Sequence, residues 1–464
     1  MPPRPRIKPI SLSRSRLYRR SRRLWMSPRL WRPRLVFWLG ALAIGLVSVG
    51  FAKAADAAQH LFRSILGEDG AWLPLCLLLT PLGFALSSWL ALRFFPGSQG
   101  SGIPQAIAAR HFHDDADRRP FLSLRLAFGK VLLTILGLGV GASIGREGPT
   151  VQVGASLMLQ AARIGNMAQA RGLILAGSAA GIAAAFNTPL AGIVFAIEEM
   201  GRAYEARTNG LVLSAVIVAG LAALGLLGNY TYFGEANAHA TTLRDWFAVL
   251  VCGVGGGALG AGFSLCALRL TRRIRRFVSP DPLRRTVMLA AACGLGVALI
   301  GLLSDGQTFG TGYEQARSAV EGSALSPFFF AEKLLASLFS MISGIPGGIF
   351  APSLSVGAGF GSAVGQLLGM GVGLAAILGM AGYFAGVVQA PMTAFVIILE
   401  MTGGNGNVIP LMLSAMLGYG TARVISPEPL YHGLSRLFIA DALRRKRAEN
   451  QYAGDASQIG ASNA

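Results

Sequence analysis

Long apolar stretches recur along this chain from about residue 36 to residue 423. Many approach the roughly 20 residues that a helix needs to cross a bilayer, and several are cut by glycine or proline. Hydrophobic residues make up 53% of the sequence and charged residues only 14%, which excludes an ordinary soluble domain and a disordered chain. The chain is therefore predicted to be an all-α polytopic membrane protein.

The net charge of +19 is concentrated beside the apolar spans. Lysine and arginine cluster in residues 1–34, which hold no acidic residue, in residues 272–285 and in residues 444–447. The positive-inside rule places such loops in the cytoplasm, and the first cluster also suits binding to anionic lipid. We predict a basic cytoplasmic N-terminal tail (1–34), a membrane domain (35–440) and a basic, polar cytoplasmic C-terminal tail (441–464), with no nucleic-acid partner.

The sequence Gly-Arg-Glu-Gly-Pro at residues 145–149 interrupts one of the apolar runs. It puts Arg146 and Glu147 at membrane depth, where ionisable residues mark an ion path or a proton relay. Its glycines and proline indicate a broken backbone, which a membrane tolerates only where it is buried in protein or lines a cavity. Comparable breaks occur at residues 100–104 and 344–352.

Each of these three breaks leads into an apolar helix and so supplies a helix N-terminus. Unpaired N–H groups and the helix dipole make such an end a binding site for an anion. Glycine lets the backbone approach the ion, and the Ser101 hydroxyl is a further donor. Three ordinary kinks are the alternative, but the breaks fall within an internal repeat, which favours a site.

The repeat relates the two halves of the chain with an offset of about 203 residues, in one order along the sequence. Weak repeats with broken segments at corresponding positions are typical of transporters, whose sites lie where the halves meet. We predict halves of about 35–230 and 245–440, whose relative orientation stays open. The matching pairs are Lys130 and Lys333, Pro149 and Pro352, Gly177 and Gly379, Pro189 and Pro391, and Glu198 and Glu400.

The three breaks, together with Tyr431 in a Pro-Leu-Tyr sequence, resemble the signature segments of the CLC family of chloride channels and transporters. The resemblance extends from about residue 35 to residue 440 and implies a bundle of tilted and broken helices with a two-fold internal repeat. It also implies a homodimer in which each subunit has its own anion pathway. The positions matched to the anion site are the hydroxyls of Ser101 and Tyr431, the backbone N–H groups of Ile349 and Phe350, and Arg146, Gly148 and Ala351.

The resemblance further assigns Glu147 as the gate and Lys130 as an electrostatic support. Glu199 matches the inner proton acceptor of family members that exchange chloride for protons, although a helix-terminal pair with Glu198, neutralised by Arg202, is the alternative. The implied function is a chloride/proton antiporter, with a passive chloride channel as the alternative. Ser101 favours chloride, while bromide and nitrate stay open.

Three further expectations come from departures and absences in the sequence. Ile107 stands where some exchangers carry an acidic residue near the matched lysine, so an ion pair with Lys130 is not expected. No histidine or lysine is spaced to activate Ser101 and no metal-binding motif appears, so neither an enzyme nor a cofactor is predicted. The short segment after Tyr431 leaves no room for the nucleotide-binding pair of eukaryotic members, so we expect the inner membrane of a bacterium.

Overall fold

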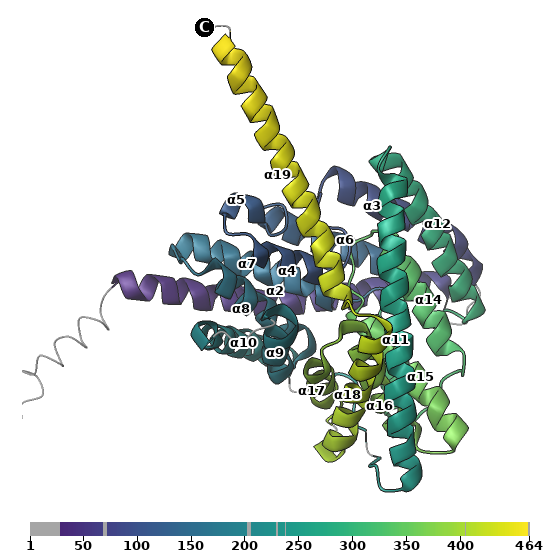
Figure 1. Ribbon diagram of the computed structural model, residues 1–464. Coiled ribbons are helices and arrows are strands. Elements are labelled where there is room, and N and C mark those ends of the chain that lie inside the picture. The colour runs from purple at the N-terminus through teal and green to yellow at the C-terminus, as the bar shows by residue number, and fades with distance from the viewer. Residues whose placement is uncertain are drawn as a thin grey trace, which may run out of the picture.

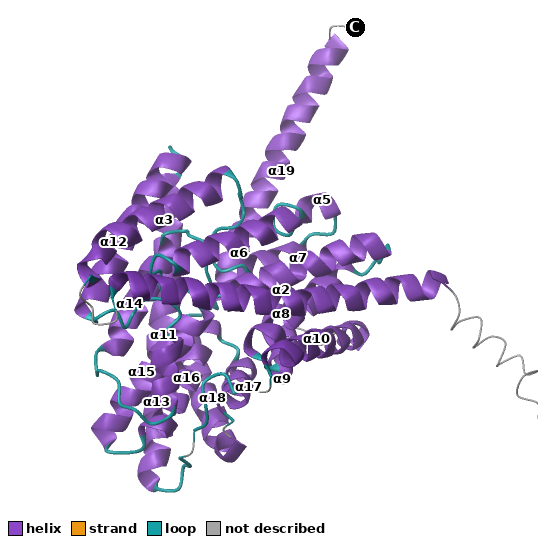
Figure 2. Cartoon of the chain, turned by 180° about the vertical axis from the view of Figure 1, so that it is seen from behind, coloured by secondary structure: helices purple, strands orange, loops and turns teal. Residues whose placement is uncertain are grey.

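The computed structural model describes residues 28–67, 72–201, 206–228, 231–236, 238–403 and 405–462. The described chain is a bundle of helices joined by loops, without a strand (Figures 1 and 2). Most of the predicted N-terminal tail lies outside the described residues.

The same order of helices occurs twice along the chain. The first series is α2 (Pro28–Leu66), α3 (Cys76–Arg93), α4 (Ile103–His111), α6 (Leu124–Leu138), α7 (Glu147–Gly165), α8 (Ala170–Phe186), α9 (Pro189–Phe195) and α10 (Ala206–Leu227). The second is α11 (Leu243–Val278), α12 (Pro282–Leu303), α13 (Tyr313–Val320), α14 (Phe329–Ile342), α15 (Phe350–Leu368), α16 (Val372–Val388), α17 (Pro391–Thr402) and α18 (Val408–Ile425). The short α5 (Asp115–Arg118) and the final α19 (Leu430–Ser462) have no partner in this scheme.

Six of the described helices are long and apolar enough to cross a membrane. They are α2, α3, α10, α11, α12 and α18. Several of the others are shorter apolar helices, among them α8, α16 and α17, as expected of a bundle in which broken helices end inside the protein. The chain is an integral membrane protein.

Glycine allows the helices of each half to pack in equivalent ways. A Cβ atom on Gly154 of α7 would collide with the Gly177 carbonyl of α8, and one on Gly357 of α15 would lie 2.8 Å from the Gly379 carbonyl of α16. Small residues at such crossings let two backbones touch, which is how helices associate in a membrane without a hydrophobic driving force. Gly177 and Gly379, which the repeat places at corresponding positions, therefore have equivalent roles in the packing of the two halves.

Two helices are longer than the apolar runs in the sequence. The apolar pattern predicts a first helix over residues 36–49, but α2 runs to Leu66. In its polar part Asp56 pairs with Arg146 and Arg63 pairs with Glu314, both on other elements. The helix after the central break begins at Glu147 rather than near residue 150.

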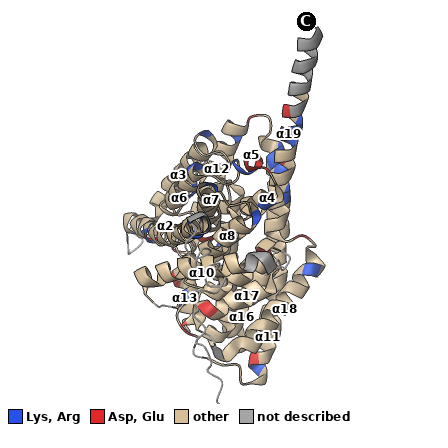
Figure 3. Cartoon of the chain, turned by 90° about the vertical axis from the view of Figure 1, so that its left-hand side faces the viewer, with Lys and Arg blue, Asp and Glu red and all other residues tan. Residues whose placement is uncertain are grey.

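The last helix, α19, continues through the predicted C-terminal tail and projects from the bundle (Figure 1). Figure 3 shows charged residues gathered where α5 and α19 meet, while most of the bundle is uncharged. Lys446 lies 2.6 Å from Asp117 and 3.7 Å from Asp114. Its hydrogen bond to Asp117 raises the pKa of the Lys446 ammonium above its usual value.

Candidate functional site

The three predicted breaks meet at the centre of the bundle. Gly100 donates a hydrogen bond to the Ile345 carbonyl at 3.2 Å and accepts one from Gly347 at 3.1 Å. Gly145 and Gly348 exchange two hydrogen bonds, of 2.6 and 2.7 Å. These backbone contacts confirm that the breaks come together, and they satisfy groups that would otherwise be orphaned at membrane depth.

The reciprocal pair of Gly145 and Gly348 also relates the two halves of the chain. The two glycines stand at corresponding positions of the repeat and are bridged in antiparallel fashion. Corresponding residues that bond to each other reciprocally are related by a local two-fold axis. Immediately after this pair the helices α7 and α15 begin, so their N-termini lie side by side at the axis.

Two hydroxyl groups lie beside these helix N-termini. Ser101 is 8% exposed and Tyr431 is fully buried, and the two hydroxyls face each other. Among the described residues neither hydroxyl has a hydrogen-bond partner of good geometry. Buried hydroxyls without partners are uncommon in proteins and indicate a place for a group that the protein itself does not supply.

Gly148 keeps the space beside the Ser101 hydroxyl free of a further side chain. A Cβ atom on Gly148 would collide with the Ser101 hydroxyl and would lie 2.9 Å from the Ser101 carbonyl oxygen and 3.3 Å from the Gly348 Cα. The absence of a side chain at Gly148 therefore preserves the space between the first break and the third.

Glu147, the first residue of α7, is completely buried. Its carboxylate faces the backbone N–H groups of Glu147 itself and of Ala351 in α15, although neither oxygen makes a hydrogen bond of normal geometry. A carboxylate is favoured at helix N-termini because it meets unpaired N–H groups and the positive end of the dipole. Glu147 thus places its carboxyl group at the kind of site that would hold an anion.

Arg146 is directed away from Glu147 and toward α2. Its guanidinium donates hydrogen bonds to the Ala52 carbonyl at 2.7 Å and to Asp56 at 2.6 Å. It also lines a cavity of about 410 Å³, which we call the Arg146-side cavity. Its predicted role as an anion ligand stays a prediction. The other lining residues are Asp56, Gln59, His60, Arg63, Leu227, Tyr232, Thr311, Tyr313 and Glu314.

Lys130 is buried and donates a hydrogen bond to the Gly100 carbonyl at 2.7 Å. The sequence had not indicated this backbone partner. The corresponding Lys333 donates to the carbonyls of Thr308 and Gly310, both at 2.8 Å. In each half a buried ammonium thus holds the loop that precedes a short helix.

The adjacent Glu198 and Glu199 have different partners. Glu198 accepts hydrogen bonds from the N–H groups of Met392 and Thr393 at the start of α17, at 3.1 and 2.6 Å. The corresponding Glu400 accepts hydrogen bonds of 3.0 and 2.7 Å from the first turn of α9, at residues 190 and 191. Each half therefore caps a helix of the other. Arg202, the predicted neutralising neighbour, lies outside the described residues.

Glu199 is buried and lies against α19. Its carboxylate oxygen Oε1 is 3.6 Å from Nε2 of His432, and its backbone carbonyl is 2.9 Å from the same nitrogen. A second cavity of about 420 Å³, the Glu199-side cavity, is lined by Met200 and His432 among others.

Sequence reasoning missed His432 and Asp56. His432 directly follows the motif residue Tyr431, and Asp56 lies on the polar stripe of α2. Both residues are visible in the sequence, but their partners could not be predicted, because Glu199 lies far from His432 along the chain and Arg146 lies far from Asp56.

Comparisons with known proteins agree with this architecture. A family model described as voltage gated chloride channel matches residues 83–423. The H(+)/Cl(-) exchange transporter ClcA of Salmonella arizonae is 32% identical over 439 residues, which cover 88% of this chain and 89% of that protein. The ClcA of Salmonella gallinarum is 31% identical over 437 residues, covering 89% and 90%.

Solved structures show the same arrangement. A slow cyanobacterial Cl-/H+ antiporter superposes with a TM-score of 0.77 at 25% identity, over 88% of this chain and 98% of that one. A CLC-type fluoride/proton antiporter shares the fold with a TM-score of 0.72 at 23% identity, over 86% and 96%. The chain belongs to the CLC family of voltage-gated chloride channels and transporters.

Proposed function

We propose that this protein is a secondary active antiporter that exchanges chloride for protons across the membrane. The observation that carries the proposal is the buried Glu147 carboxylate, which faces two helix N-termini beside two unpartnered hydroxyls. The relatives named as H(+)/Cl(-) exchange transporters support the same function.

Chloride binds between the hydroxyls of Ser101 and Tyr431 and the backbone N–H groups of Ile349 and Phe350, with Gly148 and Ala351 at the same helix ends. This site supplies hydrogen-bond donors and dipoles without a lysine at the ion. Such donors hold an anion weakly enough for it to leave again, as transport requires. Lys130 supports the site through the Gly100 carbonyl. Bromide and nitrate remain alternative anions.

Glu147 is the gate of this pathway. Its ionised carboxylate and a chloride ion compete for the same helix N-termini, because both are anions that need the same N–H groups. Protonation removes the charge and releases the side chain, so that binding of a proton and binding of chloride become linked. Arg146 fixes the start of α7 through its bonds to α2 and adds positive potential.

Glu199 is the proton acceptor on the opposite side of the site. Glu199 is buried beside α19, and its position next to the Glu199-side cavity gives protons a route that chloride does not share. Two carboxylates on either side of the central hydroxyls allow a proton to pass from Glu199 to Glu147.

The protein works as a homodimer with one anion pathway in each subunit, as in the family. Its basic segments place both termini in the cytoplasm, where they face anionic lipid, and the bacterial relatives support the inner membrane. Single-molecule photobleaching of labelled protein in liposomes tests the dimer, with two bleaching steps expected.

A passive chloride channel on the same fold is the second candidate, because a channel also needs the anion site and the gate. Proteoliposomes with an imposed chloride gradient separate the two, with chloride and pH electrodes in the bath. An antiporter drives protons uphill against their own gradient. Chloride flux with no proton movement in the unmodified protein would leave the channel as the answer.

A further inference from the structure

His432 occupies a position between the Glu199-side cavity and the Glu199 carboxylate. Its Nε2 atom is 3.6 Å from Oε1 of Glu199 and 2.9 Å from the Glu199 carbonyl oxygen. The second contact fixes the ring, because the Nε2–H group donates to that carbonyl. A small rotation of the ring would bring the same nitrogen to the carboxylate.

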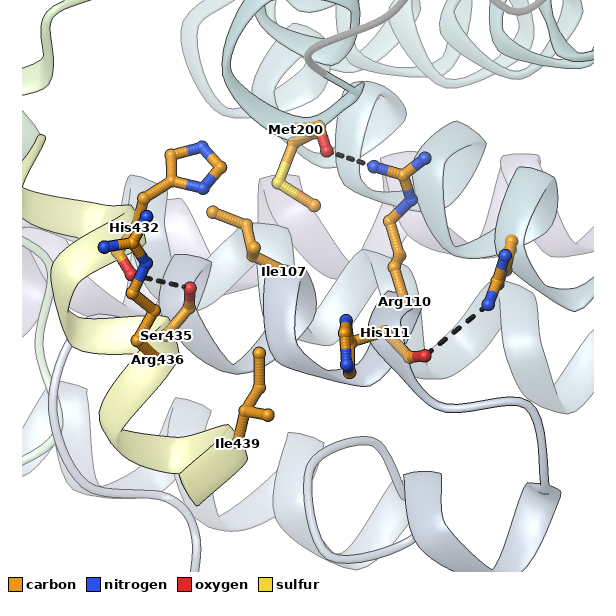
Figure 4. Close-up of a pocket in the computed structure, with 9 residues that line it drawn as sticks. Ile107, Arg110, His111, Met200, His432, Ser435, Arg436 and Ile439 are labelled. Atoms are coloured by element: carbon orange, nitrogen blue, oxygen red, sulfur yellow. Dashed lines mark hydrogen bonds between the residues drawn. The ribbon is translucent and has the colours of Figure 1, made fainter. Parts of the chain in front are cut away.

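The cavity reaches His432 but not Glu199. His432 lines it and has a side chain that is 14% exposed, whereas the Glu199 side chain is 3% exposed and does not line it. In Figure 4, Ile107 and Arg110 of α4 and His432, Ser435 and Arg436 of α19 line the same space. A proton in the water of this cavity therefore meets the imidazole before it meets the carboxylate.

We propose that His432 transfers protons between the water of the Glu199-side cavity and Glu199. The inference rests on the proposed role of Glu199 as proton acceptor. Histidine suits this task because its ordinary pKa is near neutral and its two nitrogens can take up and release a proton on different sides of the ring. In the inward step Nδ1 binds a proton from cavity water while Nε2 releases one to the carboxylate. Ring rotation or exchange with cavity water then restores the first tautomer.

The charges around His432 favour a transient proton over a permanent ion pair. Arg110 donates to the Met200 carbonyl, Arg171 lies 2.7 Å from Nε2 of His113, and Arg436 lies 3.1 Å from Glu428. These three arginines line the cavity. Their guanidinium groups repel an imidazolium, while the Glu199 carboxylate attracts it. His111 is the other titratable residue of the cavity wall, and none of its described contacts is with Glu199.

Replacement of His432 by glutamine tests the proposal in proteoliposomes. Glutamine can keep the hydrogen bond to the Glu199 carbonyl but cannot carry a proton. Proton transport is expected to fall about 100-fold, the lower range for loss of a proton-transfer group, while chloride flux persists. His111→Gln is the matched control, with a histidine from the same cavity and unchanged proton transport expected.

Chemical rescue separates proton transfer from a structural role. In His432→Ala, imidazole added on the cavity side is expected to restore proton transport, since it can bind in the space left by the ring. Absence of rescue with intact chloride flux, or equal loss of chloride and proton flux in both variants, would overturn the relay.

Glu199→Gln, measured in parallel, shows which assignment fails. If it loses proton transport while His432→Gln transports protons at the normal rate, the relay alone is wrong. If Glu199→Gln itself transports protons normally, both the role of Glu199 and the relay are wrong.

Discussion

Gly148→Ala is the sharpest test of the anion site, because it adds one methyl group where the structure has room only for a glycine. The new Cβ atom would collide with the Ser101 hydroxyl and would lie 2.9 Å from the Ser101 carbonyl oxygen. The serine side chain can rotate away, which removes a donor from the site. Otherwise the backbone of the first break must shift, which displaces the same donor.

The size of the effect follows from these two outcomes. In both outcomes the site loses one hydrogen bond to a charged ligand, which typically costs about 1–3 kcal/mol. Either outcome therefore weakens chloride binding about 5- to 150-fold. The substitution itself suits a helix, because alanine is a better helix former than glycine.

Isothermal titration of chloride into the detergent-purified protein measures this change directly. Gly262→Ala is the matched control, because a Cβ atom added to this glycine of α11 would have no neighbouring atom within 4 Å, and no change in affinity is expected. A folded Gly148→Ala protein that binds chloride with the original affinity would refute the placement of the anion beside Ser101.

Substitutions at five other positions give distinct outcomes. Glu147→Ala removes the competing carboxylate, so chloride flux should persist while uphill proton movement disappears in the liposome assay; retained coupling would contradict the gate. Lys130→Met removes one of the two hydrogen bonds to the Gly100 carbonyl and leaves the bond from Gly347, so it should loosen the first break and weaken chloride binding; Lys333→Met should lower stability alone, and equal affinities in the two would refute the supporting role. Glu400→Gln loses one charged hydrogen bond and should lower the free energy of unfolding by about 2 kcal/mol, as should Glu198→Gln; an unchanged unfolding transition in SDS would show that these caps contribute nothing.

The fold and the meeting of the breaks could be predicted because their signals are local. Apolar length, glycine and proline at corresponding positions, and a charge pair at membrane depth each constrain a short segment. Gly145 and Gly348 pair because both stand at the same position of the repeat, and the repeat is visible without coordinates. A helix is expected to begin soon after each of these glycines, because a proline stands in the first turn of both α7 and α15.

The partners of individual charges could not be predicted, because they depend on how distant segments lie in space. Arg146 bonds to Asp56 of α2. Asp56 lies beyond the apolar run of this helix, so the sequence did not indicate that it belongs to the same helix. Lys130 bonds to a backbone carbonyl. Every residue has such a carbonyl, so the sequence does not show which one accepts the bond. Glu198 and Glu199 are neighbours in the chain, yet one caps a helix and the other faces His432.

The repeat also bears on why we propose one anion site where the two-fold symmetry offers two equivalent places. Thr311 corresponds to Ser101, but its N–H and hydroxyl lie 2.9 and 3.3 Å from the side-chain oxygen of Gln59 and are satisfied within the protein. The Ser101 hydroxyl instead faces Tyr431, which is supplied by α19, the long helix without a counterpart in the repeat. The same helix carries His432 to Glu199. The two equivalent places therefore differ, because α19 contributes a hydroxyl and a titratable group to only one of them, and we infer that this difference gives the proposed pathway its direction.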